Sequence, residues 1–503
     1  MTVTSLASSG DGQAPARRNP ACIAIDLGAE SCRVSLLRWN ADTPAIELIH
    51  RIPNGPVHDC GSLRWPFDRI LAGLDEGLRK AAAASPEPIS SIAVDGWAVD
   101  YVRLGPDSRP LANPFCYRDE RTIAAKLHVD RLADPVWAFR HAGAQPLRIN
   151  TVYQLIADRA AGIDPHAPWV NLPEYVLHWL GGRRVAEYTN ATHTGLVDLA
   201  SGDWSRELLN RLEIPADSLL PIVPTGSVVG RLSGPLAELP AFRNTQLIVP
   251  ACHDTASAIA GIPTDMAGAA YICSGTWSLV GALIHSPITT ERAMKAGFTN
   301  QGAAGGGFCF HTNVNGMWIL KQCLESWNAA GRPWNLAELI AQAAGYNCPG
   351  IIPVDAAPLL LDGDMPERLN DELRKLGCDP IENCAGNEPR FARLIFESLA
   401  ARYASVLQSL EQMLGRRIGR IHILGGGSQN RLLTELTAQH TGLTVETGNV
   451  ESSTIGSFAV QTAVAESASS PLQREAVRRW ARRLSEPHDR RSAVQPEQPQ
   501  SAG

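Results

Sequence analysis

Three apolar segments of this chain each run directly into a turn that contains glycine: DLGAESCR at residues 26–33, CSGTWSL at 273–279 and LGGGSQN at 424–430. Turns of this kind can direct consecutive backbone N–H groups at an anion, because little or no side chain stands in the way. One such turn is most often only a turn, but three in series are more informative. None matches the P-loop pattern GxxxxGK[ST] or the dinucleotide pattern GxGxxG. Any phosphate chemistry here therefore belongs to a different architecture.

Apolar strand segments and helical segments alternate along most of the chain, which predicts an α/β fold. The clearest helix is residues 391–414, where apolar side chains recur every three or four positions and Gly415 follows as a C-cap. We expect a hairpin of strands at 22–27 and 34–39, further strands at 91–95, 246–250, 269–273 and 421–424, and helices at about 70–84 and 429–440.

The length of 503 residues exceeds what a single hydrophobic core usually supports, so two lobes are expected. The strand at 269–273 runs into Ser274, Gly275 and Thr276 and begins to repeat the plan of the first lobe, which suggests an internal duplication. We place the lobe boundary near 261–268. The predicted parts are a disordered tail at 1–20, a first lobe at 21–262, a second lobe at 263–466 and a flexible tail at 467–503.

Composition and charge exclude several classes of protein. The formal charge is -6 without a long basic run, so neither nucleic acid nor an anionic membrane is expected as the main partner. No segment has the roughly 18 consecutive apolar residues of a membrane span, and residues 1–20 lack the apolar core of a signal peptide. The pair Arg17 and Arg18 is rejected as an export signal because Asp26 interrupts the apolar segment that follows. We expect a cytoplasmic protein.

The 11 cysteines contain no C-x-x-C pair, and this spacing predicts neither a zinc knuckle nor a disulfide framework. Buried or reduced thiols are the preferred interpretation. A bridge between Cys378 and Cys384 is conceivable, but a cytosolic protein would rarely keep one.

Asp254 is the strongest candidate for chemistry. It stands with His253 and Thr255 at the end of an apolar strand, where a carboxylate is costly to bury without a partner or a task. A carboxylate there can take the proton from a substrate hydroxyl as that hydroxyl attacks phosphorus. The alternative is a helix N-cap, because TASAIAGI follows, and the local sequence by itself favours the cap. The two roles do not exclude each other.

Other polar positions also carry two interpretations each. Asp26 either holds a hydrated magnesium ion or caps the hairpin. Residues 95–100, DGWAVD, line a sugar site, or Trp97 is a core residue. The charged segment 117–121 is ordinarily a solvated or salt-bridged face. Asn313 and Asn315 are by default caps of an apolar helix.

The order of these motifs resembles the FGGY carbohydrate kinases, and within them the rhamnulokinases. The resemblance covers about residues 22–465. The most specific of the matching segments are EYTNATHTGLVD, ACHDTASA and CSGTWSL, and the others are AIDLGAESCR, VDGWAVDYVRL, YRDERT, INTVYQL, LPIVPTGSVVGRL, ILGGGSQNRLL and ESSTIGSFAVQ.

This resemblance implies an actin-like, ribonuclease H-like pair of lobes, with ATP and sugar in the cleft between them. It also makes Asp254 the proton acceptor, which overturns the preference for a helix cap. By the same likeness, sugar binding falls to Ala98, His253, Asp254, Thr255 and Asn313, and ATP binding falls to Ala29, Glu30, Ser31, Cys32, Arg33, Thr276, Lys321 and Gly426.

Three positions depart from the family pattern. Cys32 stands where the turn usually has glycine, so a position that can take positive φ carries a β-carbon here. Ala98 replaces a glycine that touches sugar, and its methyl group would narrow the pocket. Lys321 aligns with a glutamine near ATP, although Gln322 is adjacent.

The resemblance implies ATP- and magnesium-dependent transfer of a phosphoryl group to the C1 hydroxyl of L-rhamnulose, by a monomer or small homo-oligomer whose partners are sugar and ATP. Alternatives are a kinase for L-fuculose or a related ketose, a non-metabolic actin-like ATPase, and an enzyme that has lost activity. Sugar-dependent ATP turnover separates the kinases from the other two.

Overall fold

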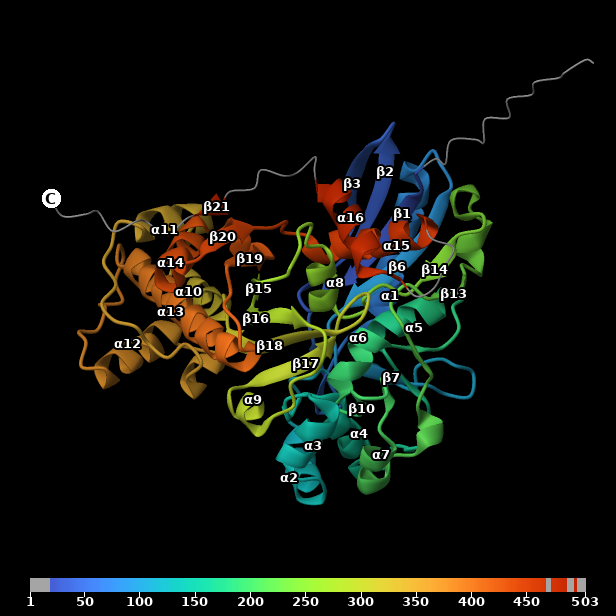
Figure 1. Cartoon of the computed structure of the whole chain (residues 1–503), viewed down its shortest axis with the longest axis horizontal. Helices are drawn as coiled ribbons and strands as arrows, with labels where there is room; N and C mark the ends of the chain where they lie inside the picture. Colours follow the sequence, from blue (N-terminus) through green and yellow to red (C-terminus); the bar gives the residue numbers. More distant parts are fainter. Residues whose placement is uncertain (1–18, 467–471, 486–492, 495–503) are drawn as a thin grey trace, which may run out of the picture.

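The computed structural model describes residues 19–466, 472–485 and 493–494, and Figure 1 shows them arranged as two lobes, each built on a mixed β-sheet. The first sheet has the order β13 (Val228–Arg231), β14 (Gln246–Ile248), β6 (Ile89–Gly96), β1 (Ala21–Leu27), β2 (Ser31–Asn40) and β3 (Thr43–Pro53). The second has the order β17 (Phe298–Gly302), β18 (Phe308–Asn315), β16 (Trp277–Ile284), β15 (Ala269–Ser274), β19 (Arg420–Leu424), β20 (Thr444–Thr447) and β21 (Ala493–Val494).

The two sheets repeat one plan. In each, an antiparallel hairpin (β1–β2 and β15–β16) is extended by a further antiparallel strand, and the first hairpin strand pairs in parallel with a later one. The repeat agrees with the duplication that the glycine turns suggest. The predicted alternation of strands and helices is confirmed, including the first hairpin.

Helices surround both sheets. Those between the strands of the first lobe are α1 (Phe67–Ala84), α2 (Thr122–Leu132), α3 (Pro135–Ala142), α4 (Thr151–Ala160), α5 (Leu172–Trp179), α6 (Tyr188–Ala191), α7 (Arg206–Leu212) and α8 (Asp254–Ala260). The later helices are α9 (Glu291–Lys295), α10 (Trp318–Ala329), α11 (Leu336–Ala343), α12 (Met365–Lys375), α13 (Glu388–Leu414), α14 (Arg431–Thr441), α15 (Ser452–Glu466) and α16 (Arg474–Ser485). Four two-stranded ribbons complete the described part: β4 (Val57–Asp59) with β5 (Ser62–Arg64), β7 (Tyr101–Arg103) with β8 (Trp169–Asn171), β9 (Ala186–Glu187) with β12 (Ile222–Val223), and β10 (Val197–Asp198) with β11 (Asp203–Trp204).

Helix α13 follows from its sequence. Its apolar side chains repeat at helical spacing and are buried, and Gly415 ends it with φ +64°, a left-handed conformation that glycine adopts without strain. The predicted helix and its cap are confirmed. The predicted helix at about 429–440 begins slightly later, at Arg431, because a short 3-10 turn, η6 (Gly426–Gln429), comes first and Asn430 caps α14.

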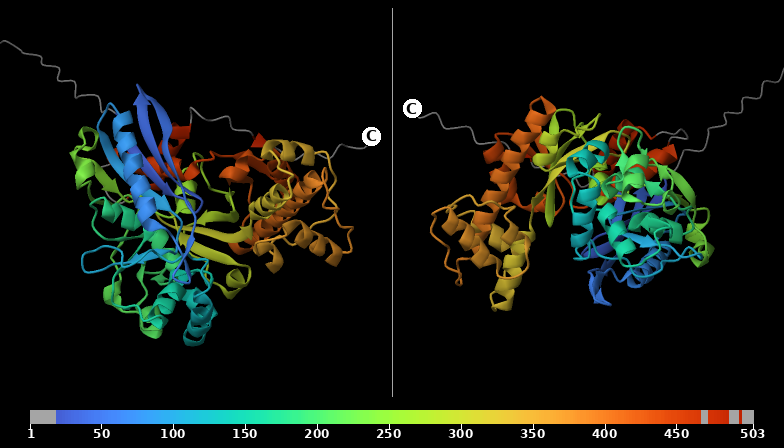
Figure 2. Two further views of the ribbon diagram at one scale, coloured as in Figure 1. Left: turned by 180° about the vertical axis from the view of Figure 1, so that it is seen from behind. Right: turned by 90° about the horizontal axis from the view of Figure 1, so that it is seen from below.

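The last two described helices return to the first sheet. Phe458 of α15 and Trp480 of α16 are buried in one cluster with Cys22, Ala24 and Leu37 of β1 and β2. Figures 1 and 2 show these helices beside the blue strands, although the two segments lie near opposite ends of the chain. The prediction of a flexible tail after residue 467 is therefore wrong for residues 474–485, whose apolar face supplies part of the core. Of the other residues of this predicted tail, only 472–473 and the strand β21 are described. Residues 1–18 of the predicted N-terminal tail also lie outside the described residues.

All eleven cysteines are free, so Cys378 and Cys384 form no bridge. Among the residues that the structure describes, no helix is long and apolar enough to cross a membrane.

Candidate functional site

Three carboxylates converge where strands of the first sheet end. Asp26 of β1 is the register partner of Asp95 of β6, and His253 bridges to Gly96, so the next residue, Asp254, begins α8 beside them. Carboxyl ends of neighbouring parallel strands share one edge of a sheet, which is the usual place for a ligand in α/β folds. Asp26 and Asp95 are almost fully buried.

The pKa of each of these carboxylates lies above its ordinary value. Burial raises the pKa of Asp254 to about 6, while hydrogen bonds from Thr255 and the charge of Arg33 oppose the rise. Burial likewise raises the pKa of Asp26 to about 6, with Arg33 lowering it and Asp254 raising it. The pKa of Asp95 lies well above its ordinary value, first because of burial and then because of the negative charges of Asp26 and Asp254.

The two carboxylate oxygens of Asp254 differ: Oδ1 accepts hydrogen bonds, whereas Oδ2 has no donor among the described residues. Its Oδ1 accepts from the Thr255 backbone N–H at 2.5 Å and from the Thr255 hydroxyl at 3.2 Å, and His253 Nε2 lies 3.3 Å away. No hydrogen bond to Oδ2 comes from the described residues, and the side chain keeps 39% of its exposure. His253 occupies the N-cap position and Asp254 is the first helical residue. The prediction of Asp254 as the N-cap is therefore wrong by one position. Among the described residues, its carboxylate accepts hydrogen bonds only from the next residue, Thr255.

The backbone before Asp254 is held by a buried glutamate that sequence reasoning did not single out. Glu187 Oε2 accepts from the Cys252 N–H at 3.0 Å and from the Thr189 hydroxyl at 2.5 Å. The same hydroxyl oxygen accepts from the His253 N–H at 3.3 Å. The EYTNAT segment thus fixes the strand end that carries His253 and Asp254. The sequence signal for Glu187 was its place in the EYTNAT motif.

Three largely buried histidines lie where this strand end meets the second sheet. Gln301 of β17 hydrogen-bonds His253 Nδ1, and the rings of His253 and His193 lie 4.2 Å apart. His311 of β18 accepts from or donates to the Tyr271 hydroxyl at 3.0 Å. Burial lowers the pKa of all three histidines to about 3, so they are neutral. These histidines come from a 3-10 turn, a helix N-cap and a strand that are far apart in sequence, so no sequence signal indicated that they lie close together.

Asn313 lies on the face of the second sheet that meets Asp254. It is the register partner of Leu279, which pairs with Cys273, and cross-strand partners share a face. Ile259 of α8, the helix that Asp254 begins, belongs to the hydrophobic cluster against which Cys273 packs, so α8 lies on this face. Asn313 is exposed within β18, and α10 begins only at Trp318, so the helix-cap interpretation of Asn313 and Asn315 is wrong.

The segment after β6 is held in a strained conformation. Val99 has φ +71°, a left-handed value that is rare for a β-branched residue and occurs mainly at functional sites. Asp100 anchors the segment by accepting from the indole N–H groups of Trp65 at 2.6 Å and Trp97 at 3.0 Å. Ala98 and Trp97 are both buried. Trp97 is thus a buried, packed residue, as its interpretation as a core residue predicts.

Two of the three glycine turns pack against each other. A Cβ on Gly427 would lie 2.1 Å from Ser274 Oγ, and a Cβ on Gly425 would lie 2.9 Å from the Ser274 carbonyl oxygen. Only glycine allows so close an approach. Gly426 between them has no atom within 4 Å of its Cβ position, so its backbone faces open space. Thr276 follows Ser274 in the neighbouring turn, and its carbonyl accepts from the Trp318 N–H at 3.2 Å.

The third turn joins β1 to β2. Gly28 is required there because a Cβ would lie 2.5 Å from the Ser31 carbonyl oxygen. Cys32 is a buried strand residue in β2 and is absent from the positive-φ residues, so its β-carbon causes no backbone strain. Glu30 forms an ion pair with Lys321 at 2.5 Å, which joins this turn to α10 of the second lobe.

Arg33 and the start of α15 complete the surroundings of Asp26. Arg33 lies 3.5 Å from Asp26 Oδ2 and pairs with Glu451. The Ser453 hydroxyl donates to the same carboxylate oxygen at 2.9 Å. The Asp26 side chain is therefore hydrogen-bonded to α15, and it does not cap the hairpin.

A hydrated magnesium ion fits these residues better than a fully protein-bound one. Asp95 Oδ1 is buried without a hydrogen-bond partner among the described residues. No group of three or more His, Cys, Asp or Glu side chains suited to a metal occurs in the described part of the chain. Mg²⁺ commonly keeps several waters and binds through one or two carboxylates plus substrate phosphates. Asp26 and Asp95 can supply the carboxylates.

Two solved structures of similar fold come from Lactobacillus acidophilus. A xylulose kinase is 15% identical with a TM-score of 0.75, and a gluconate kinase is 16% identical with a TM-score of 0.76; each match covers 95% of this chain and 94% of the other. The Plasmodium falciparum glycerol kinase with ADP is 14% identical, with the same coverage and a TM-score of 0.72. At such identities the likeness shows the fold alone, which is the predicted two-lobed, actin-like α/β fold.

Family models extend the comparison from fold to family. The N-terminal domain of the FGGY family of carbohydrate kinases matches residues 21–261, and the C-terminal domain of that family matches residues 270–465. The two models together span most of the sequence, and this protein therefore belongs to the FGGY family of carbohydrate kinases.

Proposed function

We propose that this enzyme transfers the γ-phosphoryl group of ATP to the C1 hydroxyl of L-rhamnulose, with Asp254 as general base. The observation that carries the proposal is the state of Asp254: it is partly exposed, its Oδ2 has no donor among the described residues, and it begins α8, which packs against the second sheet. Family membership supports a carbohydrate kinase. The choice of L-rhamnulose rests on the likeness of EYTNAT, HDTAS and SGTWSL to the rhamnulokinases.

The proton transfer follows from the pKa values. With a pKa of about 6, Asp254 is mostly ionised at neutral pH and can accept the hydroxyl proton. The hydroxyl oxygen forms a bond to the γ-phosphorus as the bond to the bridging oxygen of ADP breaks. The neighbouring His253 has a pKa of about 3 and stays neutral, so it positions the sugar without competing for the proton.

The nucleotide is assigned to the three glycine turns. Ala29, Glu30, Ser31, Cys32 and Arg33 form the first, while Thr276 and Gly426 belong to the packed pair of turns. Arg33 offers a cation close to Asp26, and the open space at Gly426 suits the close approach of a ligand. Magnesium would offset charge on the phosphate oxygens, with Asp26 and Asp95 as the residues that hold it.

The sugar is assigned to Ala98, His253, Thr255 and Asn313. The first lies in the strained loop, the next two flank Asp254, and Asn313 lies on the sheet face that meets it. Lys321 is assigned to the nucleotide through its ion pair with Glu30. The methyl group of Ala98 narrows the pocket, and this favours testing L-fuculose as the second substrate.

The test is a panel of L-rhamnulose, L-fuculose, L-ribulose and D-xylulose with coupled ADP detection, with and without Mg²⁺. We expect the highest kcat/KM for L-rhamnulose and loss of turnover without Mg²⁺. Preference for another ketose would refute the assigned substrate. ATP turnover that ignores sugar would refute the kinase and favour an actin-like ATPase.

The role of Asp254 is tested by Asp254→Asn, which should lower kcat by about 10²- to 10⁴-fold, the range for loss of a general base. ATP binding should survive, because the side chain is assigned to the sugar. Asp68→Asn is the matched control, since Asp68 is an exposed residue of α1. Full sugar-dependent turnover by Asp254→Asn would remove this residue from the mechanism.

A further inference from the structure

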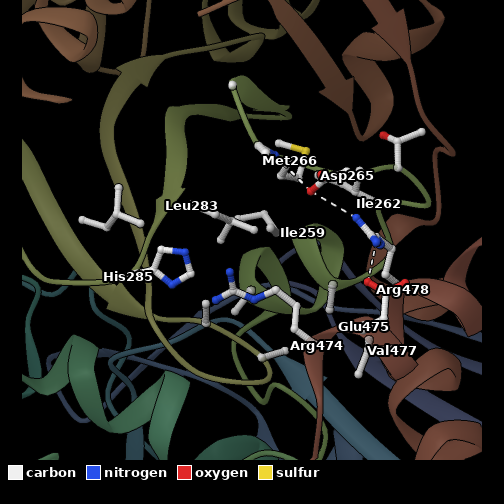
Figure 3. A pocket seen from close by; sticks show the side chains of 18 of the residues that line it. Ile259, Ile262, Asp265, Met266, Leu283, His285, Arg474, Glu475, Val477 and Arg478 are labelled. Atoms are coloured by element: carbon white, nitrogen blue, oxygen red, sulfur yellow. Dashed lines mark hydrogen bonds and ion pairs between the residues drawn. The ribbon is translucent and has the colours of Figure 1, made fainter. Parts of the chain in front are cut away.

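A cavity of about 820 Å³ lies at the end of α8 opposite to Asp254. Its walls come from both lobes: the second half of α8 and the segment after it, the end of β16, the loop after β17, the end of α13, and α16. Figure 3 shows the lining side chains converging on this space. None of the residues assigned to sugar or ATP lines it.

One wall of the cavity is apolar. Ile259, Ile262 and Met266 belong to a hydrophobic cluster that joins α8 to the second sheet, and Leu283 packs against the same cluster. The cavity volume falls within the range of about 300–1,000 Å³ that is typical of small-molecule sites. An apolar group of moderate size can therefore be buried here.

Arginine side chains line other parts of the cavity. Arg474 donates to the Gly306 carbonyl, and Figure 3 shows its guanidinium reaching below Ile259 and Leu283 toward His285. Arg416 also lines the cavity. Among the residues that the structure describes, no carboxylate forms an ion pair with Arg474 or Arg416. By contrast, a third cation of the wall, Arg478, is neutralised by Asp265 at 3.1 Å and by Glu475.

We propose that this cavity binds a small amphipathic anion, with an aliphatic body against Ile259, Ile262 and Leu283 and an anionic head group on Arg474 or Arg416, the two guanidinium groups without an ion pair among the described residues. Burying an apolar body is favourable in proportion to its area. A carboxylate or phosphate gains charge-assisted hydrogen bonds from guanidinium groups that no protein anion occupies. A neutral molecule of the same shape gains only the first of these terms.

The position of the cavity couples an occupant to the sugar site. Helix α8 carries Asp254 at one end and cavity residues Ala256, Ile259 and Ala260 toward the other. On the other side, Ala303 and Ala304 of the wall follow β17, whose Gln301 holds His253. A ligand that contacts both lobes biases how they meet. We therefore expect its binding to change the kcat for sugar phosphorylation, an expectation that rests on the proposed function.

The experiment measures binding of octanoate, octyl phosphate and octan-1-ol to the full chain by isothermal titration calorimetry. We expect at least one of the two anions to bind once per chain with a Kd below about 1 mM, and octan-1-ol to bind at least tenfold more weakly. The stronger anion identifies the head group. Failure of both anions to bind, or equal binding of octan-1-ol, overturns the proposal.

Variants locate the site. The double substitution Arg416→Gln with Arg474→Gln should weaken anion binding at least tenfold. Arg417→Gln, one position away with a side chain that is 92% exposed and outside the cavity, should leave it unchanged. Leu283→Trp should narrow the space beside the apolar wall and weaken binding, and its melting temperature shows whether it folds. If it does not fold, the arginine variants still decide. Unchanged binding in the double variant overturns the assignment.

The kinetic measurement separates this inference from the proposed function. A protein that binds octanoate but phosphorylates no ketose would refute the proposed reaction and leave the binding site standing. A protein that phosphorylates L-rhamnulose but binds neither anion would support the proposed reaction and refute the binding site.

Discussion

Gly456→Ala offers a test in which two physical effects have opposite signs. Alanine is favoured over glycine by about 1 kcal/mol in the interior of a helix, so helix propensity alone predicts a more stable protein. In this structure α15 crosses α8 at close range, and a Cβ on Gly456 would lie 1.8 Å from the Ser257 carbonyl oxygen. The atom it meets is main chain, so no side-chain rotation relieves the clash.

The size of the effect follows from these contacts. Inserting a methyl group into a packed interface costs about 1–3 kcal/mol. Separating the helices also weakens the hydrogen bond from the Ser257 hydroxyl to the Ser453 carbonyl, 2.9 Å long, at a further cost of about 1 kcal/mol. After the gain from propensity is subtracted, a net loss of about 1–3 kcal/mol remains, which lowers the melting temperature by about 3–10 °C. Because the Ser453 hydroxyl also donates to Asp26, we expect kcat to fall together with the melting temperature.

The assay is thermal unfolding together with coupled kinetics. Gly73→Ala in α1 is the matched control, because the nearest atoms to its Cβ would be side-chain atoms of Ile52, at 2.8 Å or more, and a side chain can move. We expect a clearly smaller loss for Gly73→Ala. A melting temperature for Gly456→Ala at or above that of the wild type would refute the packing of α15 on α8.

Three further predictions follow from the site and the core. The kcat/KM for sugar should fall below a pH of about 6 and stay level above pH 7, because Asp254 must be ionised to accept a proton, and a profile without this inflection would exclude it as the base. Gly426→Val should raise the KM for ATP about tenfold and leave the melting temperature unchanged, since its Cβ position is open on the protein side; equal ATP kinetics would place the nucleotide elsewhere. Trp480→Ala should cost about 3–5 kcal/mol of stability, because Trp480 is buried against β1 and β2, and an unchanged melting temperature would mean that α16 is not part of the core.

Local structure was largely predictable from sequence. The apolar runs of β1 and β15, the helical repeat of α13 and the glycine at position 415 each express a rule that acts over a few residues, so the pattern and the structure agree. The amphipathic face of α16 obeys the same rule, but its arginine-rich surface, REAVRRWARR at residues 474–483 in a polar context, concealed it. Its Trp480 and Leu484 are core residues because β1 and β2 provide a partner surface.

The chemistry of the candidate site divides in the same way. Short motifs along the chain, such as His253 with Asp254, already contain the residue types of the site and indicate the family. Three contacts arise only on folding: Glu187 holds the strand end before these residues, Gln301 meets His253 across the lobes, and Arg474 lines one cavity with Ile259, 215 positions earlier in the chain. Periodicity and motif spacing record interactions between near neighbours along the chain. Contacts between distant segments depend on how whole lobes pack, and they leave no repeat in a single sequence.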